Sequence, residues 1–171
     1  MLTLPEHQYS KLIKPLGSVN FNHMFADAVI SGRVLGRVYV DNIQTPQTFY
    51  IVHPYGMSLL FGDSENLVFN EAFKTYVLND GKVRPSAEWM QVYPEKWNTI
   101  IVRLFGDTLI KSSMHDLSNK VPLLELNTRV NFRFNKAKFI SAQEVSIEDP
   151  KILLVKNPRE VFLNMKGSVI P

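Results

Sequence analysis

The chain has 171 residues, of which 45% are apolar and 20% are charged, and its 19 Lys and Arg against 16 Asp and Glu give a net charge of +3. This composition is typical of a globular protein with a sizeable core, and it excludes disordered and collagen-like chains. The absence of cysteine excludes a thiol nucleophile, a thiolate zinc site and a disulfide framework. The N-terminus lacks a signal-peptide pattern and no apolar run has the length of a membrane span, so we expect a cytoplasmic protein without a membrane partner.

Two helices are expected at the start of the chain. Residues 5–16 form the first, which Gly17 ends, with three inward-facing side chains: Tyr9, Leu12 and Ile13. The second helix has Asn20 as its cap and ends before Gly32. Its apolar residues follow the spacing of one helix face: Phe21, Met24, Phe25, Ala28 and Val29. Both helices are therefore expected to pack against a core.

After Gly32 the apolar spacing changes to a period of two. Residues 33–41, 48–53 and 57–61 are rich in β-branched and aromatic side chains, and turn residues separate them. In the first of these segments the valines alternate with polar or amphipathic residues. We expect three sequential strands that form an antiparallel meander.

A helix, a strand and a second helix are expected next. Residues 62–64 stop the third strand and cap a helix that ends at residues 79–81. Residues 88–93 suit a strand, and Pro94 takes the first position of a helix that ends before Gly106. One face of this last helix is apolar: Trp97, Ile100, Ile101, Leu104 and Phe105.

The remainder of the chain is expected to be mostly β. Residues 111–120 are polar and suit a loop, whereas residues 123–135 alternate apolar and polar side chains as a half-buried strand does. Weaker strand candidates are residues 139–147 and 152–155, and a short helix follows from Asn157. We expect one α+β domain over residues 1–166, in which a mixed, mostly antiparallel sheet is flanked by helices.

This order of elements resembles the GNAT superfamily of acyl-CoA-dependent N-acyltransferases. Residues 36–42 and 45–48, the Phe61-Gly62-Asp63 turn and residues 129–135 look like the N-terminal half of a bacterial GNAT acetyltransferase subfamily. Members of that subfamily resemble two GNAT-like units in tandem, of which the second is expected to bind acetyl-CoA. By this resemblance, residues 167–171 begin a linker to a second unit.

The loop that would bind the acyl donor departs from the family. A working unit has Gln or Arg, two residues, Gly, one residue, then Gly or Ala, because small residues let backbone amides surround the pyrophosphate of coenzyme A. Residues 61–66 have one glycine and two carboxylates instead. At roughly 5 Å and an effective dielectric near 20, each like-charge pair costs about 3 kcal/mol. Asp63 and Ser64 are also expected to cap the helix and to compete with a phosphate for its amides.

The resemblance implies the N-terminal, non-catalytic or acceptor-side unit of an enzyme that transfers an acetyl group from acetyl-CoA to an amine. The acetyl-CoA site would lie mainly on a C-terminal unit, so no cofactor and no catalytic residue are assigned to this chain alone. The expected partners are that C-terminal unit or a second copy in a homodimer, and a small amine acceptor. A metal site and nucleic-acid binding are not expected, because no histidines have ligand spacing and the basic residues are scattered.

A basic ladder is the alternative source of function. Arg129, Asn131 and Arg133 share one face of the expected strand, and Lys136 and Lys138 follow. These donors suit an acidic ligand or partner, which would make the chain a stand-alone binding module, but alternation alone also predicts a solvated strand face.

Three tyrosines near strand ends are further ligand-binding candidates. Tyr39, Tyr55 and Tyr93 lie where GNAT folds place substrate clefts, and each carries an apolar ring with a polar hydroxyl. They are candidates for the wall of an amphipathic pocket, and burial in a domain interface is the alternative.

Overall fold

The computed structural model describes residues 1–79, 81–111, 124–127 and 134–142, and the chain divides into two compact units, residues 1–130 and 131–171. The helices of the first unit are α1 (Ile13–Leu16), α2 (Met24–Ile30), α3 (Leu67–Leu78) and α4 (Lys96–Phe105), with 3-10 helices η1 (Glu6–Leu12) and η2 (Gly106–Thr108). Its strands are β1 (Leu2–Thr3), β2 (Arg37–Val40), β3 (Thr48–Val52), β4 (Met57–Gly62), β5 (Trp89–Tyr93), β6 (Leu109–Lys111) and β7 (Leu124–Leu126). The described part of the second unit holds α5 (Lys136–Ala142).

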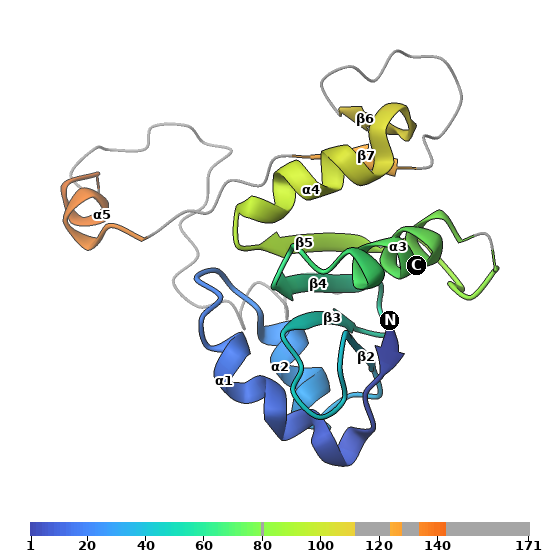
Figure 1. Ribbon diagram of the computed structural model, residues 1–171. Coiled ribbons are helices and arrows are strands. Elements are labelled where there is room, and N and C mark those ends of the chain that lie inside the picture. Colours follow the sequence, from blue (N-terminus) through green and yellow to red (C-terminus); the bar gives the residue numbers. More distant parts are fainter. Residues whose placement is uncertain (80, 112–123, 128–133, 143–171) are drawn as a thin grey trace, which may run out of the picture. The chain divides into compact units, whose positions relative to one another are not determined.

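The main sheet has five strands in the order β1-β2-β3-β4-β5. Its first three neighbouring pairs are antiparallel, and β4 and β5 are parallel, with α3 in the connection between them (Figure 1). The predicted α+β class, with a mixed and mostly antiparallel sheet flanked by helices, is therefore confirmed. β6 and β7 form a separate parallel pair, which the sequence analysis does not predict.

The sheet has a hydrophobic core on each face. Side chains of η1, α1 and α2 pack with Val38, Phe49 and Leu59 on one face. Side chains of α3 and α4 pack with Tyr50 and Leu60 on the other. All five residues of β3 are buried, because alternate side chains on this central strand face the two cores.

Helical spacing predicts most buried positions, with two errors. Tyr9 and Leu12 are buried as expected, but Ile13 is 64% exposed and Met24 is 72% exposed. Ile13 begins a four-residue helix after a 3-10 segment, so the turn angle differs from that of one continuous α-helix. The helix α2 begins only at Met24, so the helical spacing counted from Phe21 does not apply there, although Phe21 itself packs against the core.

α4 shows the predicted apolar face and end. Its face buries four residues: Trp97, Ile100, Ile101 and Phe105. Gly106 follows the helix with a φ of 48°, as expected of a glycine C-cap. The helix begins at Lys96 rather than at Pro94, although the carbonyl of Pro94 accepts a hydrogen bond from the Trp97 amide at 3.0 Å.

The second unit contains a helix where a strand was expected. Residues 139–147 are predicted as a strand, but residues 139–142 belong to α5. The amide of Lys138 donates to Asn135 Oδ1 at 3.0 Å, so Asn135 caps the helix. The rings of Phe134 and Phe139 lie 5.4 Å apart across this cap, in the arrangement of a hydrophobic staple. This local pairing explains why the apolar residues are helical.

The other predictions for the end of the chain are only partly covered by the structure. In the expected strand 123–135, the described residues form β7 at Leu124–Leu126, and residues 128–133 lie outside the described part. The expected strand 152–155, the last helix and the boundary at residue 166 also lie outside it and stay predictions.

Gly62 is required by the geometry at the end of β4. It has a φ of 93°, and a Cβ there would collide with the carbonyl oxygen of Gln47. We predict that Gly62→Ala lowers the free energy of unfolding by at least about 2 kcal/mol, from left-handed strain and this clash. Urea denaturation measures the loss. Gly17→Ala is the control, because Gly17 has a φ of −61° and a Cβ there has ordinary contacts; equal losses in both variants would contradict the prediction.

Candidate functional site

The start of α3 is closed by side chains of the preceding loop. Asn66 Oδ1 accepts a hydrogen bond from the Phe69 amide at 3.0 Å, and Asp63 Oδ1 accepts one from the Glu65 amide at 3.0 Å. The Asp63 amide donates to the carbonyl of Gln47 at 2.9 Å. In the described structure, the helix amides left without a partner here are those of Leu67 and Val68.

This closure differs from the predicted one in the identity of the cap. The sequence analysis assigns the cap to Asp63 and Ser64, whereas the structure assigns it to Asn66. Asp63 instead forms an Asx-type turn within the loop. Ser64 is buried and its carbonyl accepts a hydrogen bond from the side-chain amide of Asn70 at 2.8 Å. A side chain of the loop therefore caps the helix as expected, but that side chain is Asn66, and competition with a phosphate stays a prediction.

A second network fixes this loop to the sheet. Asp41 Oδ1 accepts from the amides of Gln47 and Thr48 at 2.9 and 3.0 Å, and its Oδ2 accepts from the Asn66 side chain at 3.3 Å. The hydroxyl of Thr48 donates to the carbonyl of Asp63 at 2.8 Å. The cap residue is thus oriented by a carboxylate at the end of β2.

The charge of the loop is partly compensated. Lys96 of α4 forms an ion pair with Glu65, with Nζ and Oε1 2.8 Å apart. This contact lowers the pKa of Glu65 and raises that of Lys96. Both side chains are more than half exposed, so the pair adds little to stability. The charge of Asp63 also contributes to the raised pKa of Lys96, so this lysine compensates Glu65 directly and Asp63 in part.

A polar cluster occupies the opposite end of the sheet. Glu88, just before β5, accepts hydrogen bonds from the hydroxyls of Tyr50 on β3 and Tyr76 on α3, the latter at 2.6 Å. The hydroxyls of Tyr50 and Ser58 lie 3.0 Å apart and share a further hydrogen bond. One carboxylate therefore links the strand, the helix and the loop between α3 and β5.

Burial keeps both phenols protonated. The pKa of Tyr50 is raised well above its ordinary value, first by desolvation and then by the charge of Glu88. Desolvation and Glu88 also raise the pKa of Tyr76, and the positive charge of Arg37 opposes this rise. Both tyrosines therefore remain hydrogen-bond donors to the carboxylate at neutral pH.

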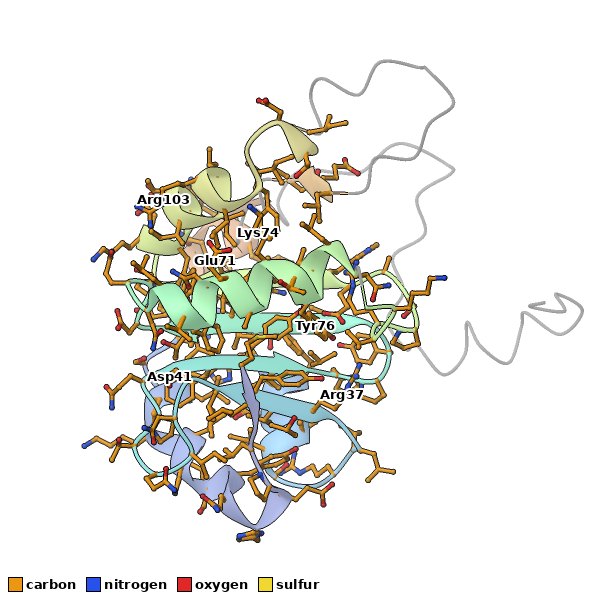
Figure 2. The ribbon with its side chains drawn as sticks, turned by 45° about the vertical axis from the view of Figure 1, so that its right-hand side comes forward. Arg37, Asp41, Glu71, Lys74, Tyr76 and Arg103 are labelled. Atoms are coloured by element: carbon orange, nitrogen blue, oxygen red, sulfur yellow. The ribbon has the colours of Figure 1, made fainter. Side chains whose placement is uncertain are left out.

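A pocket of about 360 Å³ opens beside this cluster. Its polar side chains include Arg37, His53 and Glu88, and Pro54, Gly56, Pro85 and Ser86 supply much of the remaining wall. Figure 2 shows Arg37 and Tyr76 toward one end of the sheet and Asp41 toward the other. This pocket and the closed start of α3 are thus separate places.

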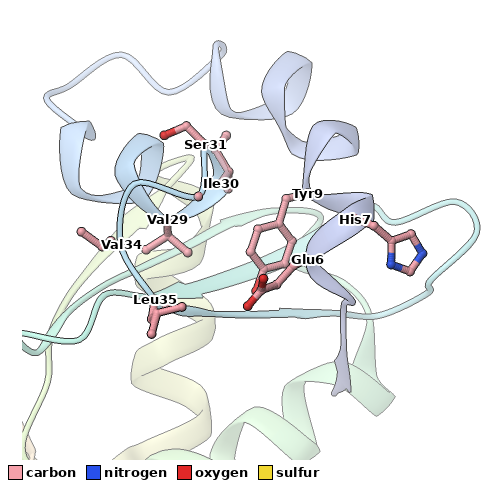
Figure 3. A pocket seen from close by; sticks show the side chains of 10 residues that line it. Glu6, His7, Tyr9, Val29, Ile30, Ser31, Val34 and Leu35 are labelled. Atoms are coloured by element: carbon pink, nitrogen blue, oxygen red, sulfur yellow. The ribbon is translucent and has the colours of Figure 1, made fainter.

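A second pocket of about 360 Å³ lies between η1 and the segment that follows α2. Figure 3 shows Glu6 and Tyr9 facing its interior, while His7 points away from it. Burial and the charge of Glu6 raise the pKa of Tyr9. Val29, Val34 and other small or apolar residues form the rest of the wall. Among the described residues, its polar lining has a carboxylate but no lysine or arginine, and His7 points away, so it offers less for the recognition of a charged ligand than the pocket beside Glu88.

The structure does not bring the three candidate tyrosines together. Tyr39 packs against Tyr50 and Tyr76 on the α3 and α4 face of the sheet. Tyr93 packs with the opposite core, with its ring 6.1 Å from that of Phe21. Tyr55 is 64% exposed in the turn between β3 and β4. The structure places the rings of Tyr39 and Tyr93 on different faces of the sheet and Tyr55 in a turn, and their role in ligand binding stays a prediction.

The basic ladder is mostly outside the described residues, since Arg129, Asn131 and Arg133 lie there. Lys136 and Lys138 are described and exposed, but they belong to α5 and not to a strand. The two lysines are expected to follow the strand, and the structure places them in the first turn of a helix. The ligand-binding role of the ladder stays a prediction.

Sequence reasoning missed the cluster around Glu88. Its members are far apart in the chain, and Tyr50 and Tyr76 look like ordinary core aromatics. The only local signal was a carboxylate directly before an apolar strand, which is too common to identify a site. Arg37 is one of the polar residues that alternate with the valines of residues 33–41, a position that indicates no role by itself.

The comparisons with known proteins identify no relative: no family model matches the chain, and no curated protein matches it. In the described residues, no group of three or more His, Asp or Glu side chains is placed to hold a metal ion. No helix there has both the length and the hydropathy to cross a membrane. The site must therefore be interpreted from its own chemistry.

The buried phenols predict a loss of stability in alkali. Tyrosines of the unfolded chain ionise near pH 10, whereas Tyr50 and Tyr76 stay protonated in the folded protein, so stability is complete below about pH 10 and falls as the pH rises. Tyr50 alone contributes up to about 1.4 kcal/mol per pH unit. Urea denaturation on both sides of pH 10 measures this slope. The double variant Tyr50→Phe, Tyr76→Phe is expected to reduce it and the exposed control Tyr55→Phe to keep it; an unchanged slope in the double variant would contradict the account.

Proposed function

We propose that this chain is the N-terminal, acceptor-side unit of a GNAT-type N-acetyltransferase and that it holds no acyl donor itself. The observation that carries the proposal is the closed start of α3, where Asn66 and Asp63 already accept from amides of the loop and helix. The sheet order and the parallel pair β4–β5, with α3 between them, are compatible with such a unit. Fold alone does not imply activity, so the loop chemistry is the stronger support.

The loop disfavours a pyrophosphate for two physical reasons. A phosphate at the start of α3 needs amides that point freely toward it, and the amide of Phe69 has an internal acceptor instead. The carboxylate of Asp63 also repels an anion, although Lys96 compensates the charge of Glu65. Displacing the Asn66 side chain would cost about 1 kcal/mol of helix capping. Two amides, those of Leu67 and Val68, remain, which is fewer than a full phosphate cradle requires.

The complete enzyme would move an acetyl group from acetyl-CoA to a small amine, with the donor on a C-terminal unit or a partner subunit. This chain would then contribute the acceptor side and an interface, and no catalytic residue on it is proposed. The alternative function, a binding module with a basic face, rests on Arg129, Asn131 and Arg133. These residues lie outside the described part, so that alternative stays a prediction.

Calorimetric titration of the 171-residue protein with acetyl-CoA tests the proposal. We expect no saturable binding in the micromolar range, because the Phe69 amide is already capped by Asn66 and Asp63 is negative. Circular dichroism confirms that the titrated protein is folded. The variant Asp63→Asn retains the oxygen that accepts from the Glu65 amide and removes the charge, so any gain in affinity reports the electrostatic part alone. Micromolar binding by the parent chain would overturn the proposal.

A further inference from the structure

The pocket beside Glu88 contains one positive and one negative side chain that do not pair with each other. Arg37 and Glu88 both line it, yet no ion pair joins them in the described structure. The guanidinium of Arg37 also has no hydrogen-bond partner among the described residues. A guanidinium and a carboxylate on the walls of one pocket can receive a ligand that supplies the opposite charges.

The carboxylate of Glu88 is oriented before any ligand arrives. Each of its oxygens accepts one phenol hydrogen, from Tyr76 and from Tyr50. A carboxylate has about four lone-pair sites, so about two remain for further donors. An ammonium group has three donors and a positive charge, which matches the sites that remain.

His53 adds a donor without adding charge. Its Nδ1 accepts a hydrogen bond from the Tyr55 amide at 3.2 Å, which places the proton of the neutral ring on Nε2. Desolvation lowers the pKa of His53, so the ring is neutral at pH 7. Arg37 and Glu88 thus set the charge of the pocket, and their sum is zero. A ligand with only a positive or only a negative charge would compensate either Glu88 or Arg37 and leave the other charge without a partner.

We propose that this pocket binds a small zwitterion of the amino-acid class, with its ammonium group at Glu88 and its carboxylate at Arg37. The volume of about 360 Å³ lies in the range of small-molecule sites and can hold a free amino acid. Pro54 and Pro85 line the pocket, and each fixes its own backbone φ. The carboxylate of Glu88 is held in place before a ligand binds.

This site is independent of the proposed acyl transfer. It lies at the beginning of β4, where Gly56 lines it, whereas the closed loop begins at Gly62. Six residue steps separate Gly56 from Gly62, about 20 Å of extended chain. Failure of the acetyl-CoA proposal would leave this inference standing, and the reverse is also true.

Titration calorimetry of the full chain with the proteinogenic amino acids tests the proposal, together with two probes that carry one charge each. Glycine methyl ester has only the ammonium group and N-acetylglycine has only the carboxylate. We expect at least one amino acid to bind and both single-charge probes to bind at least about tenfold more weakly than it does, since each lacks one charged hydrogen-bonding group. Binding by no amino acid, or equal binding by either single-charge probe, would overturn the proposal.

Variants locate the binding in the pocket. Arg37→Gln is expected to weaken the binding of that amino acid at least about tenfold, the effect of losing a hydrogen bond to a charged group. Arg103→Gln, at an exposed position on α4, is the matched control and should bind as the parent does. Glu88→Gln should also weaken binding, with thermal unfolding measured beside it because this residue holds two tyrosines. If Glu88→Gln does not fold, Arg37→Gln decides: unchanged affinity in that variant would refute the assignment.

Discussion

The competition for backbone amides at the start of α3 decides what this end of the sheet can bind. Every helix begins with amides that lack internal partners, and these amides attract either an anion or a side-chain cap. Here Asn66 and Asp63 provide the acceptors, and Asp41 holds Asn66 in place through a contact of 3.3 Å. The proposed absence of an acyl donor follows from this local arrangement more than from the charge of the loop, because Lys96 compensates one of the two carboxylates.

At the opposite end of the sheet, a carboxylate binds side-chain hydroxyls rather than backbone amides. Glu88 brings together β3, α3 and the start of β5 through two phenols that burial keeps protonated. The carboxylate therefore stabilises the fold while one side of it faces a pocket with Arg37. A group held so firmly is well suited to recognise a charge, since little freedom is lost when a ligand binds.

The main features of the fold could be predicted from residue spacing, because the period of a strand or a helix can be recognised within a few consecutive residues. The alternation around Val38 predicted β2, and the face that contains Trp97 predicted α4. The spacing of apolar residues does not show which of them lie beyond the buried part of a helix face. Ile13 and Met24 are therefore expected to be buried, although both are exposed. At residues 139–142 the apolar pattern suited a strand, but the local cap by Asn135 and the pairing of Phe134 with Phe139 favoured a helix.

The candidate sites were harder to predict because their residues meet only in the folded chain. Glu88 contacts Tyr50 across 38 positions of sequence, and no local pattern indicates that pairing. Tyr39 and Tyr93 lie on different faces of the sheet. Side chains alternate between the two faces along a strand, so a position near a strand end does not fix which face a ring occupies. The loop before α3 was the exception: its polar residues predicted a closed helix start, although the cap was assigned to the wrong residue.

The most direct test of the account follows the backbone amide of Phe69 by nuclear magnetic resonance while coenzyme A is added. This amide donates to Asn66 Oδ1, so its resonance reports whether the helix start stays closed. The account predicts that the Phe69 resonance does not move, while the protein remains folded throughout the titration. A saturable shift of Phe69, accompanied by Leu67 and Val68, would show that a phosphate displaces the cap and would contradict the account.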